Sequence, residues 1–125
     1  MTATTRDETP VAIEGGGVEL RMKEVGGDMT AAFVKFPKGT DMGPAVKGLP
    51  GDMCQCPHWG VVLDGAITVR YADGTEETTS AGETYYWPGG HTGWTDGGVV
   101  FYEVSPTAEI TPVLDHLAAQ MAAAS

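Results

Sequence analysis

Short runs of β-branched and aromatic residues, separated by glycine-rich turns, dominate the chain from residue 11 to residue 106. The 125 residues include 18 glycines and 8 prolines. Glycine permits a positive φ and proline interrupts strand hydrogen bonding, so this composition supplies turns. We expect roughly seven or eight short strands, at the spacing typical of a sandwich or barrel. The sequence therefore predicts an all-β domain.

Strands are expected over 11–25 as a hairpin around glycines 15–17, and over 29–36, 59–71, 75–80, 82–88 and 99–106. Asp64-Gly65 is expected to divide the run 59–71 into two strands, and Asp73-Gly74 to form the next hairpin. Residues 37–52 contain three prolines and are predicted to form a long loop. Loops of this length are uncommon in a compact domain unless they have a function.

The chain is expected to divide into a flexible tail over residues 1–10, one β-domain over 11–106 and a helical extension over 107–125. Thr111 is expected to cap the helix, with Pro112 at its first position. Apolar residues then recur at helical spacing. These residues are Val113, Leu114, Leu117, Ala118 and Met121.

The formal net charge of −10 argues against two classes of partner. An acidic protein repels phosphate backbones and anionic lipid, so neither nucleic acid nor a membrane surface is expected. The N-terminal residues lack the apolar stretch of a secretion signal, and no window is apolar enough to span a bilayer. Cys54 and Cys56 are poorly spaced for a disulfide. Reduced thiols and a cytoplasmic location are the expectation.

Both cysteines and two of the three histidines lie between residues 54 and 91. Cys54, Cys56 and His58 are spaced by two, so an extended backbone places them on one face, and His91 returns after a glycine-rich turn. Thiolates and imidazoles suit Zn²⁺, with Fe, Ni or Cu as alternatives. Pro57 interrupts the strand, so three ligands are favoured over four. In the competing interpretation, the cysteines are small buried hydrophobic residues.

Three further residues are candidates for a site. Glu103 lies in an otherwise apolar strand and would act as a general acid or base if it faced the interior, but the outward orientation is equally consistent with the sequence. Trp94 and Tyr86 bracket His91 and are the expected ligand-binding residues of an aromatic pocket. Core packing is the alternative for such aromatic residues.

The glycine and proline pattern over residues 15–106 resembles the cupin superfamily, and especially its small single-domain bacterial proteins. Gly82, Pro88 and Gly90 match the second cupin motif, although Gly93 occupies its histidine position. With the first motif aligned on Gly65, its His, His and Glu positions are occupied by Asp52, Cys54 and His58. The resemblance implies a double-stranded β-helix, a jelly-roll barrel with a C-terminal helix and a site in its cavity.

This resemblance leaves two functions open. The first is a metal-dependent oxygenase, isomerase or lyase, in which the metal polarises a small-molecule substrate and Glu103 moves a proton. The second is a non-catalytic ligand-binding or sensing module. A structural protein whose barrel is filled with side chains is a third possibility. Small cupin-like barrels often pair, so a homodimer is expected.

Overall fold

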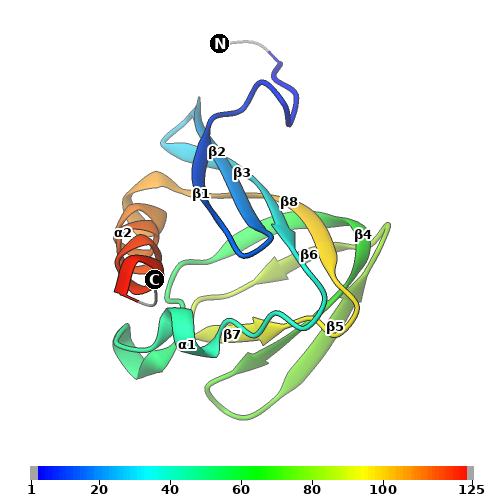
Figure 1. Ribbon diagram of the computed structural model, residues 1–125, viewed down its shortest axis with the longest axis vertical. Helices are drawn as coiled ribbons and strands as arrows, with labels where there is room; N and C mark the ends of the chain where they lie inside the picture. Colours follow the sequence, from blue (N-terminus) through cyan, green and yellow to red (C-terminus); the bar gives the residue numbers. More distant parts are fainter. Residues whose placement is uncertain (1–2, 124–125) are drawn as a thin grey trace.

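The computed structural model describes residues 3–123 as eight β-strands, two α-helices and one 3₁₀ helix (Figure 1). In chain order they are β1 (Val11–Gly15), β2 (Val18–Gly26), β3 (Met29–Phe36), α1 (Gly43–Val46), η1 (Pro50–Asp52), β4 (His58–Tyr71), β5 (Glu76–Ser80), β6 (Thr84–Trp87), β7 (His91–Trp94), β8 (Val99–Pro106) and α2 (Thr107–Ala123).

All strand pairs are antiparallel, in the order β1-β2-β3-β8-β4-β5, and β6 and β7 also pair with β4. The first half of β4 pairs with β6 and β8, whereas its second half pairs with β5 and β7. One long strand thus belongs to both walls of the barrel (Figure 1). The predicted all-β barrel with a C-terminal helix is confirmed.

The predicted division at Asp64-Gly65 is wrong, because β4 runs unbroken through it. The pairing register with β8 shifts between Val62 and Asp64, so the strand bends there instead of turning back. Gly65 has a φ of 76°, and a Cβ at this position would lie 2.1 Å from the carbonyl oxygen of Gly98. Asp-Gly here bends a strand from one wall into the other. Strand β7, the four residues His91–Trp94, was not expected.

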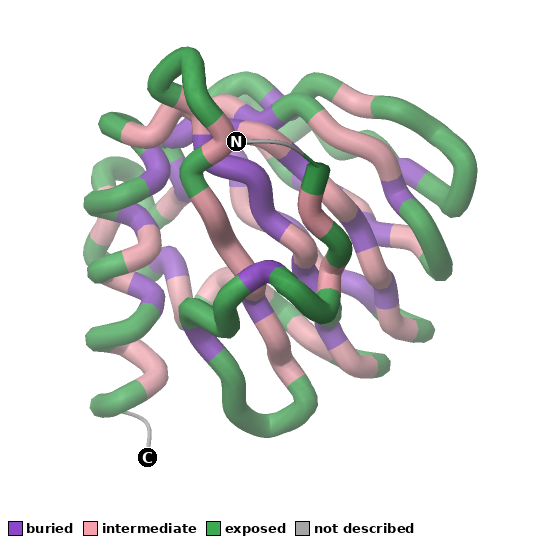
Figure 2. Tube along the Cα trace, turned by 90° about the horizontal axis from the view of Figure 1, so that it is seen from above, coloured by how far each residue is buried: buried purple, intermediate pink, exposed green. Residues whose placement is uncertain are grey.

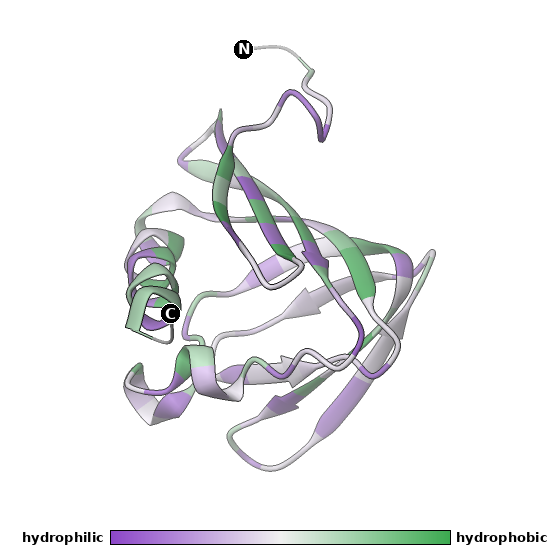
Figure 3. Cartoon of the chain, viewed as in Figure 1, coloured by the Kyte–Doolittle hydropathy of each residue, from purple (hydrophilic) through white to green (hydrophobic). Residues whose placement is uncertain are grey.

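The core lies between the two walls and follows the two-residue period of the strands. In β8, Val99, Phe101, Glu103 and Ser105 are buried, while the intervening residues are partly exposed. Figure 2 shows buried residues recurring along the strands and exposed turns between them, and Figure 3 shows that hydrophobic and hydrophilic residues both occur on the strands. This alternation places Glu103 in the interior.

Helix α2 packs beside α1 at one end of the barrel (Figure 1). It begins at Thr107, directly after β8, so the predicted cap at Thr111 is wrong and Pro112 lies inside the helix. Proline costs a helical hydrogen bond, but apolar contacts offset that loss, since Ile110, Val113 and Leu117 are buried. The predicted extension reached residue 125, and residues 124 and 125 lie outside the described part.

The predicted long loop contains α1 and η1, and it holds α2 in place. His116 Nε2 donates a hydrogen bond to the Lys47 carbonyl (2.7 Å), and Gln120 Nε2 donates to the same oxygen (2.8 Å). Near the N-terminus, which was expected to be a flexible tail, Thr9 is buried and its carbonyl accepts a hydrogen bond from Arg21 (3.0 Å). No helix among residues 3–123 has the length and hydrophobicity to cross a bilayer.

Candidate metal centre

Backbone hydrogen bonds bring Cys54 and His91 together. The Cys54 N–H donates to the His91 carbonyl (2.7 Å), and the His91 N–H donates to the Cys54 carbonyl (3.1 Å). The glycine turn before His91 packs against the same segment, because a Cβ on Gly89 would lie 2.2 Å from the Gln55 carbonyl oxygen. Only glycine allows that approach. The turn therefore fixes two side chains that are 37 positions apart in sequence.

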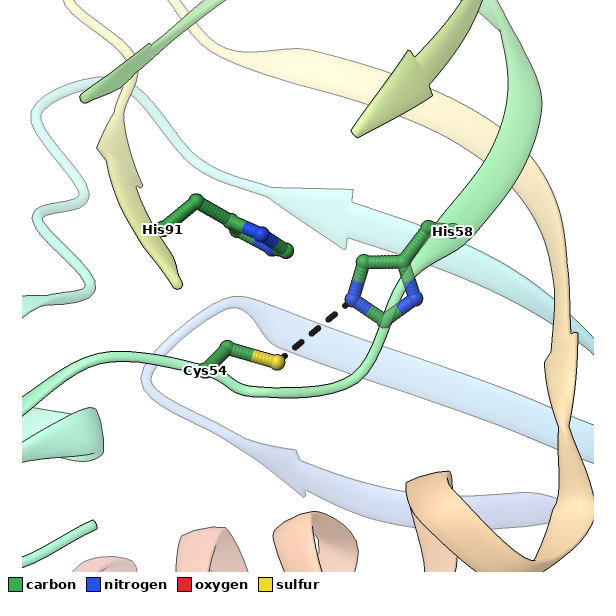
Figure 4. Close-up of side chains that lie close together, drawn as sticks. All are labelled: Cys54, His58 and His91. Carbon is green, nitrogen blue, oxygen red and sulfur yellow. Dashed lines mark hydrogen bonds between the residues drawn. The ribbon is translucent and has the colours of Figure 1, made fainter. Parts of the chain in front are cut away.

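His58, the first residue of β4, completes a buried cluster with Cys54 and His91 (Figure 4). The Cys54 Sγ and His58 Nε2 atoms are 3.6 Å apart, and the two imidazole centroids are 5.1 Å apart. One donor atom from each of the three residues lies within 4.8 Å of the others. The two histidines thus face each other inside the barrel.

The other ring nitrogens of the histidines already have partners. His91 Nδ1 donates to the Pro88 carbonyl (2.7 Å). His58 Nδ1 lies 2.7 Å from Ser105 Oγ and 3.3 Å from Glu103 Oε2. A proton on each Nδ1 leaves both Nε2 lone pairs free toward Cys54. Partners of this kind orient metal-bound histidines in proteins.

Burial keeps the cluster uncharged in the absence of an ion. It lowers the pKa of both His58 and His91 to about 4, with His58 also opposing the charge on His91. It raises the pKa of the Cys54 thiol to about 11. At neutral pH the site therefore contains two neutral imidazoles and a thiol that donates to His58 Nε2.

Glu103 lies beside His58 and is almost fully buried. Burial raises its pKa to about 7, and the Tyr85 hydroxyl, which donates to Glu103 Oε1 (2.7 Å), partly opposes that shift. A carboxyl group with a pKa near neutrality can both accept and donate a proton. Of the two orientations that the sequence left open, the structure has the inward one.

Cys56 is fully buried but lies outside the cluster. Its thiol donates a hydrogen bond to the Pro57 carbonyl, with Sγ 3.3 Å from the oxygen. The expected common face of Cys54, Cys56 and His58 fails because the chain bends between Cys54 and His58 instead of remaining in a strand. For Cys56 the interpretation as a buried hydrophobic residue fits better. Asp52 is exposed, and its carboxylate accepts the Gly48 N–H.

The structure does not place Tyr86 and Trp94 at the cavity. Tyr86 is 51% exposed and stacks on Trp59 outside the barrel. The Arg70 guanidinium lies over Trp94, with its Cζ 5.0 Å from the centroid of the indole ring. Both residues are one position out of phase with the interior, since their neighbours Trp87 and Gly93 line the cavity. The expectation that Tyr86 and Trp94 line an aromatic pocket is therefore corrected, because neither residue is part of the cavity wall.

Sequence reasoning gave no role to Ser105 and Thr92, and it chose Tyr86 over Tyr85 and Trp87. The alternation contained the missing signal, because Tyr85 and Trp87 share one face of β6 and pair with the His58 end of β4. Ser105 follows Glu103 by two residues and shares its inward face. Knowing the inward face of one residue on β6 and one on β8 would have identified Tyr85, Trp87 and Ser105. Thr92 lies between the buried His91 and Gly93 of β7, so alternation alone would not have identified it.

The cluster fits a divalent metal in geometry and in charge. One sulfur and one nitrogen bound to a tetrahedral zinc ion lie roughly 3.5 Å apart, and Cys54 Sγ and His58 Nε2 are already 3.6 Å apart. A bound ion would deprotonate the thiol. The charges of the ion, the Cys54 thiolate and the Glu103 carboxylate then cancel, so binding would bury no net charge.

Comparison with solved structures identifies the architecture. An RmlC-like cupin from Shewanella frigidimarina superposes with a TM-score of 0.60 at 19% identity, over 86% of this chain and 92% of the other. This chain has the cupin fold. A protein of unknown function from Rhizobium leguminosarum aligns with a TM-score of 0.64 at 19% identity, over 84% of this chain and 95% of that one.

One cupin-fold enzyme is also similar. A mutant of Bacillus subtilis oxalate decarboxylase has a TM-score of 0.57 at 15% identity, and the match covers 80% of this chain but only 28% of the larger enzyme. No protein-family profile and no curated protein matches the sequence. The resemblance noted in the glycine and proline pattern is confirmed at the level of the fold.

Proposed function

We propose that this cupin-fold protein binds one divalent metal ion through Cys54, His58 and His91 and acts on a small molecule in the adjoining cavity. The observation that carries the proposal is the convergence of three buried donor atoms whose histidines are already oriented by Pro88 and Ser105. One thiolate with two imidazoles favours Zn²⁺ over Fe, Ni or Cu.

Three protein ligands leave a coordination position open, which is characteristic of catalytic rather than structural zinc sites. A metal there would supply Lewis-acid polarisation of a substrate oxygen. Glu103 is the general acid or base, because its carboxylate is buried beside the ligands and lies 3.3 Å from His58 Nδ1. Tyr85 fixes the other carboxylate oxygen through its hydroxyl. Proton transfer of this kind favours an isomerase or lyase over an oxygenase.

A non-catalytic binding module is the second candidate, and the position of α2 favours it. Four residues of this helix line the cavity, so the helix covers the space where a substrate would enter. A sensor that closes over its ligand would have the same arrangement. In either case Cys54 must stay reduced to bind metal, so we propose a reducing compartment such as the cytoplasm.

Metal analysis of the purified protein after loading with Zn²⁺ and desalting tests the proposal. Wild type is expected to retain one equivalent of zinc, and His58→Ala and Cys54→Ser are expected to lose it. Cys56→Ser is the matched control, since it removes a thiol two residues away and should retain the ion. A folded wild-type protein that retains no zinc, or a Cys56→Ser variant that loses it as Cys54→Ser does, would contradict the proposal.

A further inference from the structure

The cavity beside the metal centre has an almost entirely hydrocarbon wall. It has a volume of about 90 Å³ and is bounded by the barrel strands and by α2. Met22, Val34 and Phe101 from the strands and Ile110, Val113 and Leu117 from α2 are among the lining residues. An apolar wall gains most from contact with apolar ligand surface.

Two polar atoms interrupt this wall without a partner of their own. In the part of the chain that the structure describes, Trp87 Nε1 and Thr92 Oγ1 are the buried side-chain nitrogen and oxygen atoms that make no hydrogen bond. Both residues line the cavity, and Trp87 is only 3% exposed. Leaving a buried donor unpaired is costly, and almost all such groups in proteins have a partner. A ligand with an acceptor would satisfy the indole N–H.

The charged side chains that line the cavity restrict the class of ligand further. The cavity-lining residues among 3–123 include no lysine and no arginine, and Glu103 supplies the only carboxylate. In the metal-free protein, an anionic ligand would therefore enter the cavity without a countercharge, and the net charge of the protein is already −10.

Size sets the last limit. An apolar protein cavity of about 150 Å³ is known to hold one benzene molecule, and this cavity is smaller, at about 90 Å³. With α2 in place the cavity fits a compact ligand of a few heavy atoms. Sugars, nucleotides and aromatic acids exceed that size or carry too many polar groups.

We infer that the cavity binds a compact, uncharged, mainly hydrocarbon molecule with one oxygen, such as a small ketone, whose oxygen accepts a hydrogen bond from the Trp87 indole. This inference rests on the proposed function, because it names the substrate class of the same cavity. It does not need the metal, since Trp87 is not a metal ligand. Trp87 is thus the residue that selects an oxygen-bearing ligand over a pure hydrocarbon.

Nuclear magnetic resonance titration with three probes of four heavy atoms each tests the inference. Acetone, isobutene and acetate are added to ¹⁵N-labelled protein, first metal-free and then zinc-loaded, while the indole N–H signals are followed. Acetone is expected to shift the Trp87 signal in both forms and to bind the metal-free protein more tightly than the other two probes. Acetate binding to the metal-free protein at least as tight as acetone binding, or a Trp87 signal that acetone leaves unmoved, would overturn the inference.

Trp87→Phe provides the second measurement, with Trp94→Phe as the matched control outside the cavity. Loss of one hydrogen bond is expected to lower the ratio of ketone to hydrocarbon affinity about fivefold in Trp87→Phe and not in Trp94→Phe. An unchanged ratio would overturn the inference. If Trp87→Phe fails to fold, the response of the Trp87 indole signal in the wild-type titration tests the inference alone. Loss of zinc retention with intact ketone binding would contradict the metal proposal alone. Zinc retention without ketone binding would contradict only this inference.

Discussion

Strands β4 and β6 carry two neighbouring aromatic pairs that face opposite ways. His58 and Trp87 pair across the ladder and lie inside the barrel, with 5% and 3% of their surfaces exposed. One residue further along, Trp59 and Tyr86 pair outside, where they are 42% and 51% exposed. The outer rings stack at 5.0 Å, whereas the inner rings meet edge to face at 6.4 Å.

The two pairs differ in what their polar atoms do. Inside, His58 Nδ1 is held by Ser105 and the Trp87 N–H is unpaired, so both residues present chemistry to a cavity. Outside, water can satisfy the polar atoms of Trp59 and Tyr86, and their rings simply cover the sheet. Only the pair that the strand period turns inward thus presents polar atoms to the proposed metal and ligand site.

The largest expected contrast is in stability. Trp87→Ala should lower the free energy of unfolding by about 3–5 kcal/mol, because it empties a buried site of aromatic size. Tyr86→Ala should cost less than about 1 kcal/mol, since half of that ring is already exposed. Urea unfolding of both variants measures the difference. Equal losses would break the distinction between the two faces.

The next contrast concerns the group that orients His58. Ser105→Ala should weaken zinc binding by about 10- to 100-fold, because partners of metal-bound histidines contribute that much to affinity. Ser80→Ala, on exposed β5, should leave the affinity unchanged. Competition with a chelator measures both variants. Wild-type affinity in Ser105→Ala would mean that Glu103 alone holds the imidazole.

The pH dependence of zinc binding tests the buried thiol. Cys54 must lose its proton to bind the ion, and burial raises the pKa of this thiol to about 11. Apparent affinity should therefore rise about tenfold per pH unit from about pH 7.5 to 9. The imidazoles, with pKa values of about 4, are already neutral throughout that range and add no slope. The competition assay, repeated across this pH range, measures the slope. The control variant Cys56→Ser should have the same slope as wild type. A wild-type affinity that does not change with pH would argue against thiolate coordination.

The smallest contrast uses two residues of β4. Ile67→Val removes one methylene from a residue that is 3% exposed and should cost about 0.5–1.5 kcal/mol. Leu63→Val, at a position that is 51% exposed, should change the free energy of unfolding by less than about 0.5 kcal/mol. Urea unfolding again measures both. A larger effect at Leu63 would show that the outer face is covered in solution, as the expected homodimer allows.

Much of the fold was predictable because local chemistry specifies it. The Asp73-Gly74 hairpin, the strands of the barrel and the apolar stripe of α2 all follow from turn residues and periodicity. The bend at Gly65 was not predictable, because Asp-Gly occurs equally well in a hairpin and in a bulge. Only the close approach of Gly98 determines which of the two forms here. The start of α2 was missed because Pro112 resembles a first-turn residue, whereas burial of Ile110 extends the helix backward.

Within the site, sequence named Cys54, His58, His91 and Glu103 but also Cys56, Tyr86 and Trp94. Spacing by two assumes an unbroken strand, and the bend between Cys54 and His58 removes Cys56 from the cluster. The choice between Tyr86 and Trp87 depended on which face of β6 is buried, and the sequence of a single strand of aromatic residues does not indicate that face. The roles of these residues in binding metal or substrate stay predictions.

The sequence by itself determined an all-β cupin-like barrel and the residue types able to bind a metal, because turn formation and ligand chemistry are properties of individual residues. Only the tertiary structure decided which of those residues meet. Pairing across strands sets the distance between Cys54, His58 and His91, and the packing of α2 sets the size of the cavity. Both depend on contacts between segments that are far apart in the chain, and these contacts select one face of each strand.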